Sequence, residues 1–259
     1  MSRRILLVLQ YDGTAYAGWQ AQPNGLAVQE RVERELHKLT GEAARLHASG
    51  RTDSGVHARA QVAHFDTDSR IPAEKFAYAL NAGLPRDIRA AYSGPAPAGF
   101  HARFDVKRKH YRYALFCGPH GNPFLRDTAL HVHCPLNVGA MEEAAALLVG
   151  EHDFAAFKAA GVEPKSTIRT LYASHWERES GGLLCYYVAG SGFLYNMVRI
   201  LVGAMLEVGK GRRGAGSVAQ ALRTGSRLDA GPTAPAHGLM LWRVEYPGFD
   251  TEDHIPPAR

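Results

Sequence analysis

The stretch from Gly50 to His57 combines residue types that can present a reactive carboxylate. It lies between two apolar runs, residues 43–46 and residues 61–65, and it exceeds the two to five residues that a hairpin connection needs. Asp53 follows Arg51 and Thr52 on this loop, which glycines frame. An ionised Asp in such a place can act as a nucleophile or as a general base. A polar turn with a capping Asp has the same local composition, so the loop alone leaves both interpretations open.

Several other short blocks accompany this loop along the chain. They are Tyr11-Asp12-Gly13-Thr14, Gly18-Trp19-Gln20, Phe100-His101-Ala102-Arg103-Phe104, Tyr111-Arg112-Tyr113, Gly150-Glu151-His152-Asp153-Phe154, residues 193–199 and residues 233–239. Together with the Asp53 loop, these blocks and their order resemble the tRNA pseudouridine synthases of the TruA family. The resemblance covers residues 4–246. Within the loop the chain departs from the family at Ser54, where Ala is common.

Pseudouridine formation breaks the bond between C1′ and N1 of a uridine and joins C1′ to C5, so positive charge develops on the sugar. One ionised carboxylate can trap or stabilise that charge, and no metal or organic cofactor is required. The resemblance assigns the role of nucleophile to Asp53 and places Arg199 against it as an ion-pair partner. It also implies that Tyr111 contacts the substrate, where the ring can stack on uracil. Arg51 is a candidate for filling the gap that a flipped base leaves.

The neighbours of Arg199 and Tyr111 agree with these roles without proving them. Met197, Val198 and Ile200 predict a largely buried helix around Arg199. A buried guanidinium needs a partner because an unpaired charge is costly in the interior, whereas on an exposed face its stem would reach solvent. Tyr111 and Tyr113 point to the same face of a predicted strand, and Tyr113 suits the core better.

The hydrophobic pattern predicts the same order of elements in both halves of the chain. Strands are expected at residues 5–10, 44–48, 61–65, 88–93, 109–116, 170–176, 184–188 and 241–245. Helices are expected from Val28, from Pro72, and at residues 137–149, 194–208 and 218–222. The repeated order is the ferredoxin-like βαββαβ unit.

The expected class is therefore α+β, with the pseudouridine synthase fold that the resemblance implies. In that fold, two ferredoxin-like halves join in an extended, mainly antiparallel sheet with helices on one side and a central cleft. The predicted halves are residues 1–104, which carry the Asp53 loop, and residues 105–247. Residues 248–259 are expected to form a flexible tail.

Basic residues point to an acidic partner. The chain has 30 Lys and Arg against 25 Asp and Glu, a net charge of +5, which favours RNA without requiring it. Candidate phosphate contacts fall in two groups: Arg51, Arg59, Arg103, Lys107, Arg108, Lys109 and Arg112, and then Lys210, Arg212 and Arg213. For any one of these charges, a solvated surface residue is an equal alternative. The resemblance implies tRNA as the partner, with uridines 38, 39 and 40 of the anticodon arm as targets, and a homodimer.

Other classes of protein fit less well. The three cysteines are widely spaced without a CxxC pair, and His131 and His133 suit one face of a strand better than a metal site. No apolar run has transmembrane length, so we expect a cytoplasmic protein that does not enter a membrane. A non-catalytic RNA-binding module would not need Asp53. A glycoside hydrolase would need a second carboxylate beside the bond, and the next acidic residue, Asp66, lies beyond the strand.

Overall fold

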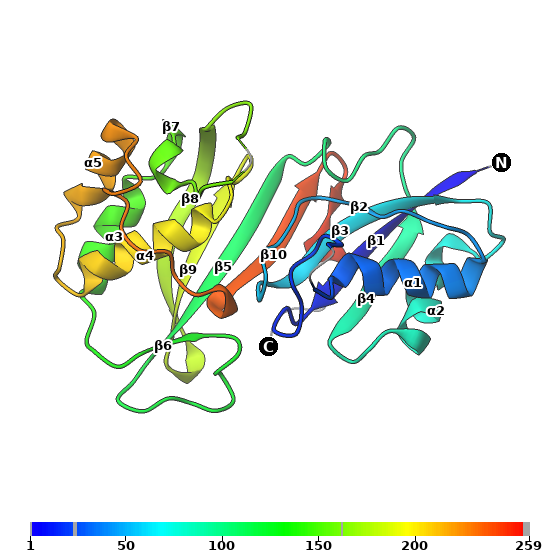
Figure 1. The fold of residues 1–259 in the computed structure, drawn as a ribbon, viewed down its shortest axis with the longest axis horizontal. Helices are drawn as coiled ribbons and strands as arrows, with labels where there is room; N and C mark the ends of the chain where they lie inside the picture. The colour runs from blue at the N-terminus through cyan, green and yellow to red at the C-terminus, as the bar shows by residue number, and fades with distance from the viewer. Residues whose placement is uncertain (1, 23–24, 162, 256–259) are drawn as a thin grey trace. The chain divides into compact units, whose positions relative to one another are not determined.

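The computed structural model describes residues 2–22, 25–161 and 163–255. The chain packs into two compact units (Figure 1). The N-terminal unit consists of residues 1–107 together with residues 240–259, and the C-terminal unit consists of residues 108–239. The first unit is therefore discontinuous in sequence, because the end of the chain returns to it.

The N-terminal unit is built on a sheet in the order β4-β1-β3. β1 (Arg3–Tyr11) pairs antiparallel with both β3 (His57–Thr67) and β4 (Ile88–Pro95). The short β2 (His47–Ala48) adds antiparallel to the far part of β3. β10 (Leu239–Tyr246) adds to the start of β3 in parallel, with Met240 opposite His57. Residues 5–9 of β1 are almost completely buried, as expected for a strand with neighbours on both sides.

Two helices pack on one face of this sheet (Figure 1). α1 (Val28–Thr40) buries Val28, Val32 and Leu36 at the spacing of one helical face, and it ends at Gly41, whose φ of 74° only glycine adopts without strain. α2 (Phe76–Gly83) buries Phe76 and Leu80 and follows a single 3₁₀ turn, η1 (Ala73–Lys75). The helices expected from Val28 and Pro72 are thus confirmed.

The C-terminal unit contains antiparallel strands in the order β5-β9-β8-β7. β5 (Arg108–Cys117), β9 (Leu183–Gly190) and β8 (Ile168–Glu179) form its long ladders. β7 (Gly150–Asp153) pairs with β8, and β6 (Leu130–Val132) runs parallel to β5. The short 3₁₀ turns η2 (Ala155–Phe157), η3 (Ser180–Gly182) and η4 (Ala236–Gly238) connect these elements.

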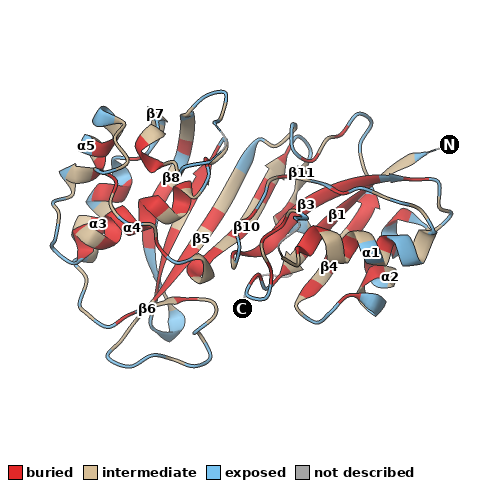
Figure 2. Cartoon of the chain, viewed as in Figure 1, coloured by how far each residue is buried: buried red, intermediate tan, exposed pale blue. Residues whose placement is uncertain are grey.

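α3 (Val138–Ala146), α4 (Met197–Gly209) and α5 (Gly216–Thr224) complete the C-terminal unit. α4 is its central helix, and it is buried along most of its length (Figure 2). Gly203 allows the segment before η4 to lie directly on α4, because a Cβ at this position would stand 1.9 Å from the carbonyl oxygen of Pro232. The predicted helix at residues 194–208 is confirmed, although it begins at Met197 instead of Leu194.

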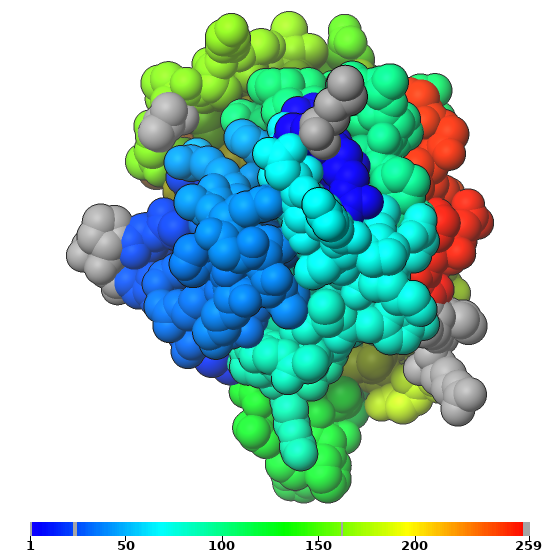
Figure 3. All heavy atoms as spheres, turned by 90° about the vertical axis from the view of Figure 1, so that its right-hand side faces the viewer, coloured from blue at the N-terminus to red at the C-terminus, as the bar shows by residue number. Residues whose placement is uncertain are grey.

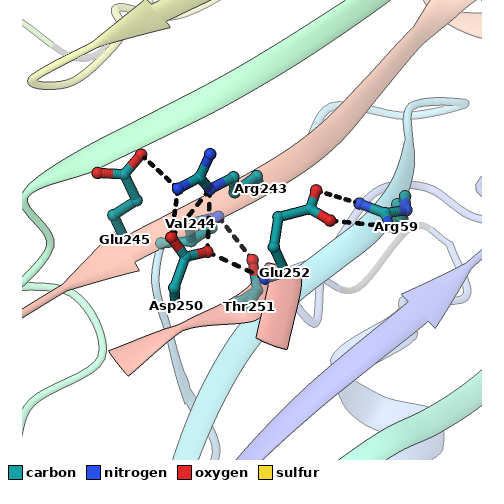
Figure 4. A network of polar contacts seen from close by, with 7 residues as sticks. All are labelled: Arg59, Arg243, Val244, Glu245, Asp250, Thr251 and Glu252. Atoms are coloured by element: carbon teal, nitrogen blue, oxygen red, sulfur yellow. Dashed lines mark hydrogen bonds and ion pairs between the residues drawn. The ribbon is translucent and has the colours of Figure 1, made fainter. Parts of the chain in front are cut away.

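The end of the chain is folded back on the N-terminal unit. β11 (Phe249–Asp250) pairs with β10, and η5 (Thr251–His254) follows it. Asp250 accepts hydrogen bonds from Arg243, and the Thr251 hydroxyl accepts one from the Val244 amide at 3.0 Å (Figure 4). The red C-terminal residues lie on the surface of this unit in Figure 3. The prediction of a flexible tail is therefore wrong for residues 249–255, while residues 256–259 lie outside the described residues.

The mixed α+β class is confirmed, and most predicted elements are present. Two elements are shorter than expected: β2 is only the last part of the strand expected at residues 44–48, and α3 ends before residue 149. The short strands β6, β7 and β11 are not among the predicted elements. The division into units assigns residues 105–107 and 240–247 to the N-terminal unit. The description as two ferredoxin-like halves that join across a cleft stays a prediction.

Candidate active site

Asp53 lies on the irregular connection between β2 and β3. Thr52 is buried, Asp53 is half-buried, and Arg51 is exposed to solvent. The Asp53 carbonyl accepts a hydrogen bond from the Val56 amide at 3.1 Å, which closes a turn that contains Gly55 at a φ of 75°. The chain then enters β3 at His57, so the carboxylate is presented immediately before a buried strand.

The segment from Tyr11 to Trp19 holds this loop in place. The Trp19 amide donates to the carbonyl of Thr52 at 3.1 Å, and the Gly55 amide donates to the carbonyl of Tyr16 at 3.2 Å. Gly18 makes the approach possible, since a Cβ there would stand 2.6 Å from the Thr52 carbonyl oxygen. The two N-terminal blocks of the sequence, for which no chemistry was predicted, therefore act as the scaffold of the Asp53 loop.

His57 fixes the same segment from the other side. Its imidazole is 2% exposed, and its Nδ1 accepts a hydrogen bond from the Gly13 amide at 3.0 Å. Asp12 Oδ1 lies 3.2 Å from the same nitrogen and accepts hydrogen bonds from Thr14. Partial burial raises the pKa of Asp12, but the hydrogen bonds from Thr14 and the interaction with His57 together outweigh this effect and hold the pKa below its usual value. Asp12 is thus an ionised turn residue that holds the Thr14 backbone and side chain.

Arg199 lies in the first turn of α4 in the C-terminal unit. Its Nε donates to the Ala234 carbonyl at 2.8 Å, and one terminal nitrogen donates to Asn196 Oδ1 at 2.9 Å. The Ala234 amide donates to the Arg199 carbonyl at 3.0 Å, so the two backbones are also joined. Asn196, just before the helix, has a φ of 58°, a conformation that Asn tolerates better than most residues. Arg199 and Glu207 are the α4 residues that are not buried, so the prediction of a buried helix is confirmed.

Tyr111 and Tyr113 project from β5 on the face that the prediction assigned to both. Tyr111 is 8% exposed and packs edge to face against Phe193, with ring centroids 5.0 Å apart. Tyr113 is completely buried, as predicted for a core aromatic, and its hydroxyl donates to the Pro235 carbonyl at 2.8 Å. Burial raises the pKa of Tyr113 although the charge of Arg199 opposes the shift. The structure therefore gathers Tyr113, Arg199 and residues 234–235 in one place.

The structure separates the basic residues into exposed and paired side chains. Arg103, Lys107 and Arg108 are exposed, and Lys109 is half-buried. The guanidinium of Arg103 lies over the Phe104 ring at 5.8 Å, and that of Arg108 lies over the Tyr172 ring at 4.5 Å. Both pairs combine a cation with an exposed aromatic ring, and such a combination can contact a phosphate and a base together.

Two of the predicted phosphate contacts are instead ion pairs within a unit. Arg59 has a side chain that is 8% exposed and binds Glu252 through both terminal nitrogens at 2.6 and 3.1 Å (Figure 4). Its guanidinium also lies over the Trp242 ring at 4.8 Å. Arg112 binds Glu179 in the same two-point manner at 2.7 and 3.0 Å. These geometries argue against Arg59 and Arg112 as RNA contacts. Their partners lie far away in the sequence, so no local signal indicated the pairing.

The second basic group lies on the loop that follows α4. Lys210 and Arg212 are exposed, and Arg212 forms a salt bridge with Glu207 at 3.1 Å. Arg213 is half-buried and donates to the Asp229 carbonyl. Lys210 and Arg212 are thus exposed to solvent, and their contact with a phosphate stays a prediction, whereas Arg213 stabilises the segment before η4.

The residues that the structure describes contain no group of three or more His, Cys, Asp or Glu side chains that could hold a metal ion. The rings of His131 and His133 have centroids 6.3 Å apart, and the three cysteines are free thiols. None of the described helices has the length and apolar character that crossing a membrane requires.

Comparison with known proteins decides the family. Residues 7–105 and 144–247 match the family described as tRNA pseudouridine synthase. The chain belongs to the tRNA pseudouridine synthases. The matched range includes the Asp53 loop, its scaffold at residues 11–19, Arg199 and the segment at residues 233–239. The β6 region and the folded C-terminal segment lie outside it.

Individual tRNA pseudouridine synthases resemble the chain over nearly its whole length. The tRNA pseudouridine synthase A of Geobacter sulfurreducens is 50% identical over 244 residues, which are 94% of this chain and all of that protein. The proteins of the same name from Brevibacillus brevis and Halalkalibacterium halodurans are 46% and 47% identical, with 94% and 93% of this chain and 100% and 92% of those proteins covered. A solved archaeal box H/ACA sRNP Nop10-Cbf5 complex matches with a TM-score of 0.37 and 12% identity, over 78% of this chain and 44% of that one, which is too low to support an argument.

Proposed function

We propose that this chain converts uridine to pseudouridine in the anticodon arm of tRNA, with Asp53 as its essential carboxylate. The observation that carries the proposal is the loop of Asp53: a half-buried acid whose neighbours Thr52 and Gly55 are hydrogen-bonded to the backbone of Trp19 and Tyr16, within a chain of the tRNA pseudouridine synthases. A fixed carboxylate is the group that the reaction requires.

The reaction is an isomerisation, so it needs neither a co-substrate nor a cofactor. The bond between C1′ and N1 breaks, the uracil turns, C1′ joins C5, and the proton on C5 is lost to solvent while N1 gains one. Attack of Asp53 on C1′, addition to C6 of uracil and removal of the 2′ proton all start from the ionised carboxylate. Each of them needs the acid aligned with the nucleoside before bond breaking.

Arg199 and Tyr111 are the proposed partners of Asp53. The Arg199 guanidinium is held at Nε and at one terminal nitrogen, so its charge is oriented by the C-terminal unit itself. Such a cation lowers the pKa of a neighbouring carboxylate and keeps it ionised. The Tyr111 ring, fixed by Phe193, is the proposed platform for the target uracil.

The substrate is bound mainly through its backbone and shape. A uridine in a stem must leave the base stack to react, and the exposed side chain of Arg51 on the Asp53 loop is the proposed occupant of the gap. The proposed phosphate contacts are Arg103, Lys107, Arg108, Lys109, Lys210 and Arg212. Uridines 38, 39 and 40 are the proposed targets, because readout of shape tolerates neighbouring positions. A cytoplasmic homodimer is the proposed working form.

The test uses tRNA transcripts tritiated at C5 of uridine, with no added metal or cofactor. The wild-type protein should release tritium to water, and Asp53→Asn should slow the release at least about 10³-fold while keeping its affinity for tRNA. Mapping the product should place pseudouridine at positions 38–40. Binding without release by the wild type would instead identify a tRNA-binding module, and unchanged release by Asp53→Asn would remove Asp53 from the mechanism.

A further inference from the structure

A chain of buried side-chain hydrogen bonds reaches the Asp53 loop from the sheet below it. Gln61 on β3 is completely buried and has its amide fully used. Its Oε1 accepts from Ser49 Oγ at 2.7 Å, and its Nε2 donates to the Gly50 carbonyl at 2.8 Å and to the Tyr11 hydroxyl at 3.4 Å. The Tyr11 hydroxyl lies 2.9 Å from Thr52 Oγ1. The Gln61 amide thus contacts both Ser49 and Gly50, where the loop begins, and it is linked to Thr52 through the Tyr11 hydroxyl.

The direction of these hydrogen bonds follows from the donors available. Burial raises the pKa of Tyr11, so its hydroxyl keeps its proton. Because the Gln61 amide nitrogen can only donate, the Tyr11 oxygen accepts there, and its own hydrogen is available for Thr52 Oγ1, although either hydroxyl can donate in that contact. Removing a member of the chain would leave a buried polar atom without its partner, which is costly in the interior.

The same chain determines where the peptide between Thr52 and Asp53 lies. The Thr52 side chain is held by Tyr11, and the Thr52 carbonyl is held by the Trp19 amide at 3.1 Å. On the other side, the Asp53 carbonyl is held by the Val56 amide at 3.1 Å. The backbone of Asp53 is therefore fixed before and after its Cα, and the Tyr11 hydroxyl is the one side-chain contact in this set that comes from β1.

We infer that Tyr11 and Gln61 are positioning residues for the isomerisation: the Gln61–Tyr11–Thr52 chain sets the place of Asp53 without touching the substrate. The inference rests on the proposed role of Asp53. It predicts that loss of the Tyr11 hydroxyl affects the chemical step more than the binding of tRNA, because a displacement of about 1 Å can cost about 10²-fold in rate.

The test compares Tyr11→Phe with a matched control in the C-terminal unit. Tyr186 is also completely buried, and its hydroxyl is 2.8 Å from Ser174 Oγ, so Tyr186→Phe removes an equivalent hydrogen bond far along the sequence. For each variant we would measure kcat and KM for tritium release, together with the Tm. Tyr11→Phe should lower kcat about tenfold or more and change KM less than about twofold. Tyr186→Phe should lower the Tm by a similar amount and leave kcat unchanged.

Two further variants keep the test decisive if Tyr11→Phe does not fold. Thr52→Val removes the same hydroxyl contact from the loop side and should reproduce the loss of kcat, whereas Thr52→Ser retains the hydroxyl and should restore most of it. Wild-type kcat in both Tyr11→Phe and Thr52→Val, or an equal loss in Tyr186→Phe, overturns the inference. An inactive wild type or an active Asp53→Asn would overturn the proposed function itself. Assays of the wild type and of Asp53→Asn therefore separate that failure from a failure of the inference about Tyr11 and Gln61.

Discussion

The two units hold their candidate site residues by opposite means. Asp53 stands on an irregular loop, where its neighbours are fixed one by one through hydrogen bonds to residues 11–19 and to Gln61. Arg199 stands on a 13-residue helix whose other side chains are nearly all buried, and its guanidinium donates hydrogen bonds to Ala234 and Asn196. The loop is positioned by specific polar contacts, whereas the helix is positioned by packing.

This difference predicts how each site fails. A loop lacks a regular ladder of backbone hydrogen bonds, so the loss of one polar contact can move its reactive residue without unfolding the unit. A buried helix moves as a rigid body, so damage to its packing lowers the stability of the unit before it changes the local geometry. In the N-terminal unit a substitution should therefore be able to lower activity without lowering stability, whereas in the C-terminal unit damage to the packing should appear first as a loss of stability.

The largest effects are expected at two glycines that lie against a backbone carbonyl. A Cβ at Gly13 would stand 2.0 Å from the Val56 oxygen, and one at Gly203 would stand 1.9 Å from the Pro232 oxygen. Each Gly→Ala change should lower the free energy of unfolding by about 3 kcal/mol, because a backbone segment has to move. Assayed well below its Tm, Gly13→Ala should still lose more than about tenfold in kcat, and Gly203→Ala should lose less.

Gly139→Ala is the control for these glycines. It lies in α3, where the nearest atom to the added Cβ is Asn137 Oδ1 at 3.6 Å, so the change should be neutral or stabilise by up to about 1 kcal/mol. Denaturant unfolding gives the stabilities, and tritium release gives kcat. Equal losses of kcat in Gly13→Ala and Gly203→Ala would break the contrast between the two units.

Arg199→Lys tests how the guanidinium of the C-terminal unit is oriented. A lysine keeps the charge but cannot bind the Ala234 carbonyl and Asn196 together, so kcat should fall about 10²-fold with little change in KM. Arg112→Lys is the matched control, since it breaks an equally planar pair with Glu179 in the same unit. It should lower the Tm and leave kcat alone. A kcat within about twofold of wild type for Arg199→Lys would argue against its proposed role as the partner of Asp53.

The smallest effect is a difference between the pH ranges in which the two units lose stability. Burial, and then the charges of Arg4, His101 and His47, lower the pKa of His64 to about 4, against a smaller opposing effect of Asp66. The unfolded chain therefore binds more protons than the folded N-terminal unit between about pH 6.5 and pH 4, and about 2–3 kcal/mol of stability is lost as the pH falls through that range. In the C-terminal unit, the hydrogen bond from Arg112 lowers the pKa of Glu179 to about 2, so its contribution is lost only below about pH 4.5.

Unfolding followed against pH should show these two ranges in turn. His64→Gln should flatten the change between pH 6.5 and 4, and Glu179→Gln should flatten the change below pH 4.5. Residue-specific hydrogen exchange assigns each loss to its unit. A single transition that neither substitution alters would show that other groups govern the acid response.

The sequence predicts elements well where one face alone is buried. The spacing of Val28, Val32 and Leu36, followed by Gly41, gave α1 with its correct end. β3 is predicted to begin at Gln61, but it begins at His57 and is buried on both faces. Its first four residues alternate His57 and Arg59 with two alanines, and because alanine has a low strand propensity they are assigned to the loop.

The motifs predict Asp53, Arg199 and Tyr111 as candidate site residues, and their roles stay predictions. Tyr11 and Thr52 also lie in blocks of the sequence, but their link through Gln61 is recognised only when the fold brings the three residues together. Long-range ion pairs were missed for the same reason. Arg59 and Glu252 are 193 residues apart, and neither sequence neighbourhood indicates the other.

The return of the chain end to the N-terminal unit has a consequence for biosynthesis. β3 leads directly out of the Asp53 loop, and the start of that strand pairs with β10, whose Met240 lies opposite His57. A ribosome has to make the whole C-terminal unit before this partner strand exists. During that interval the nascent chain carries an unpaired edge of a buried strand, which is the kind of surface that chaperones protect. The carboxylate loop is thus among the first parts of the protein to be synthesised, and its sheet is among the last to be completed.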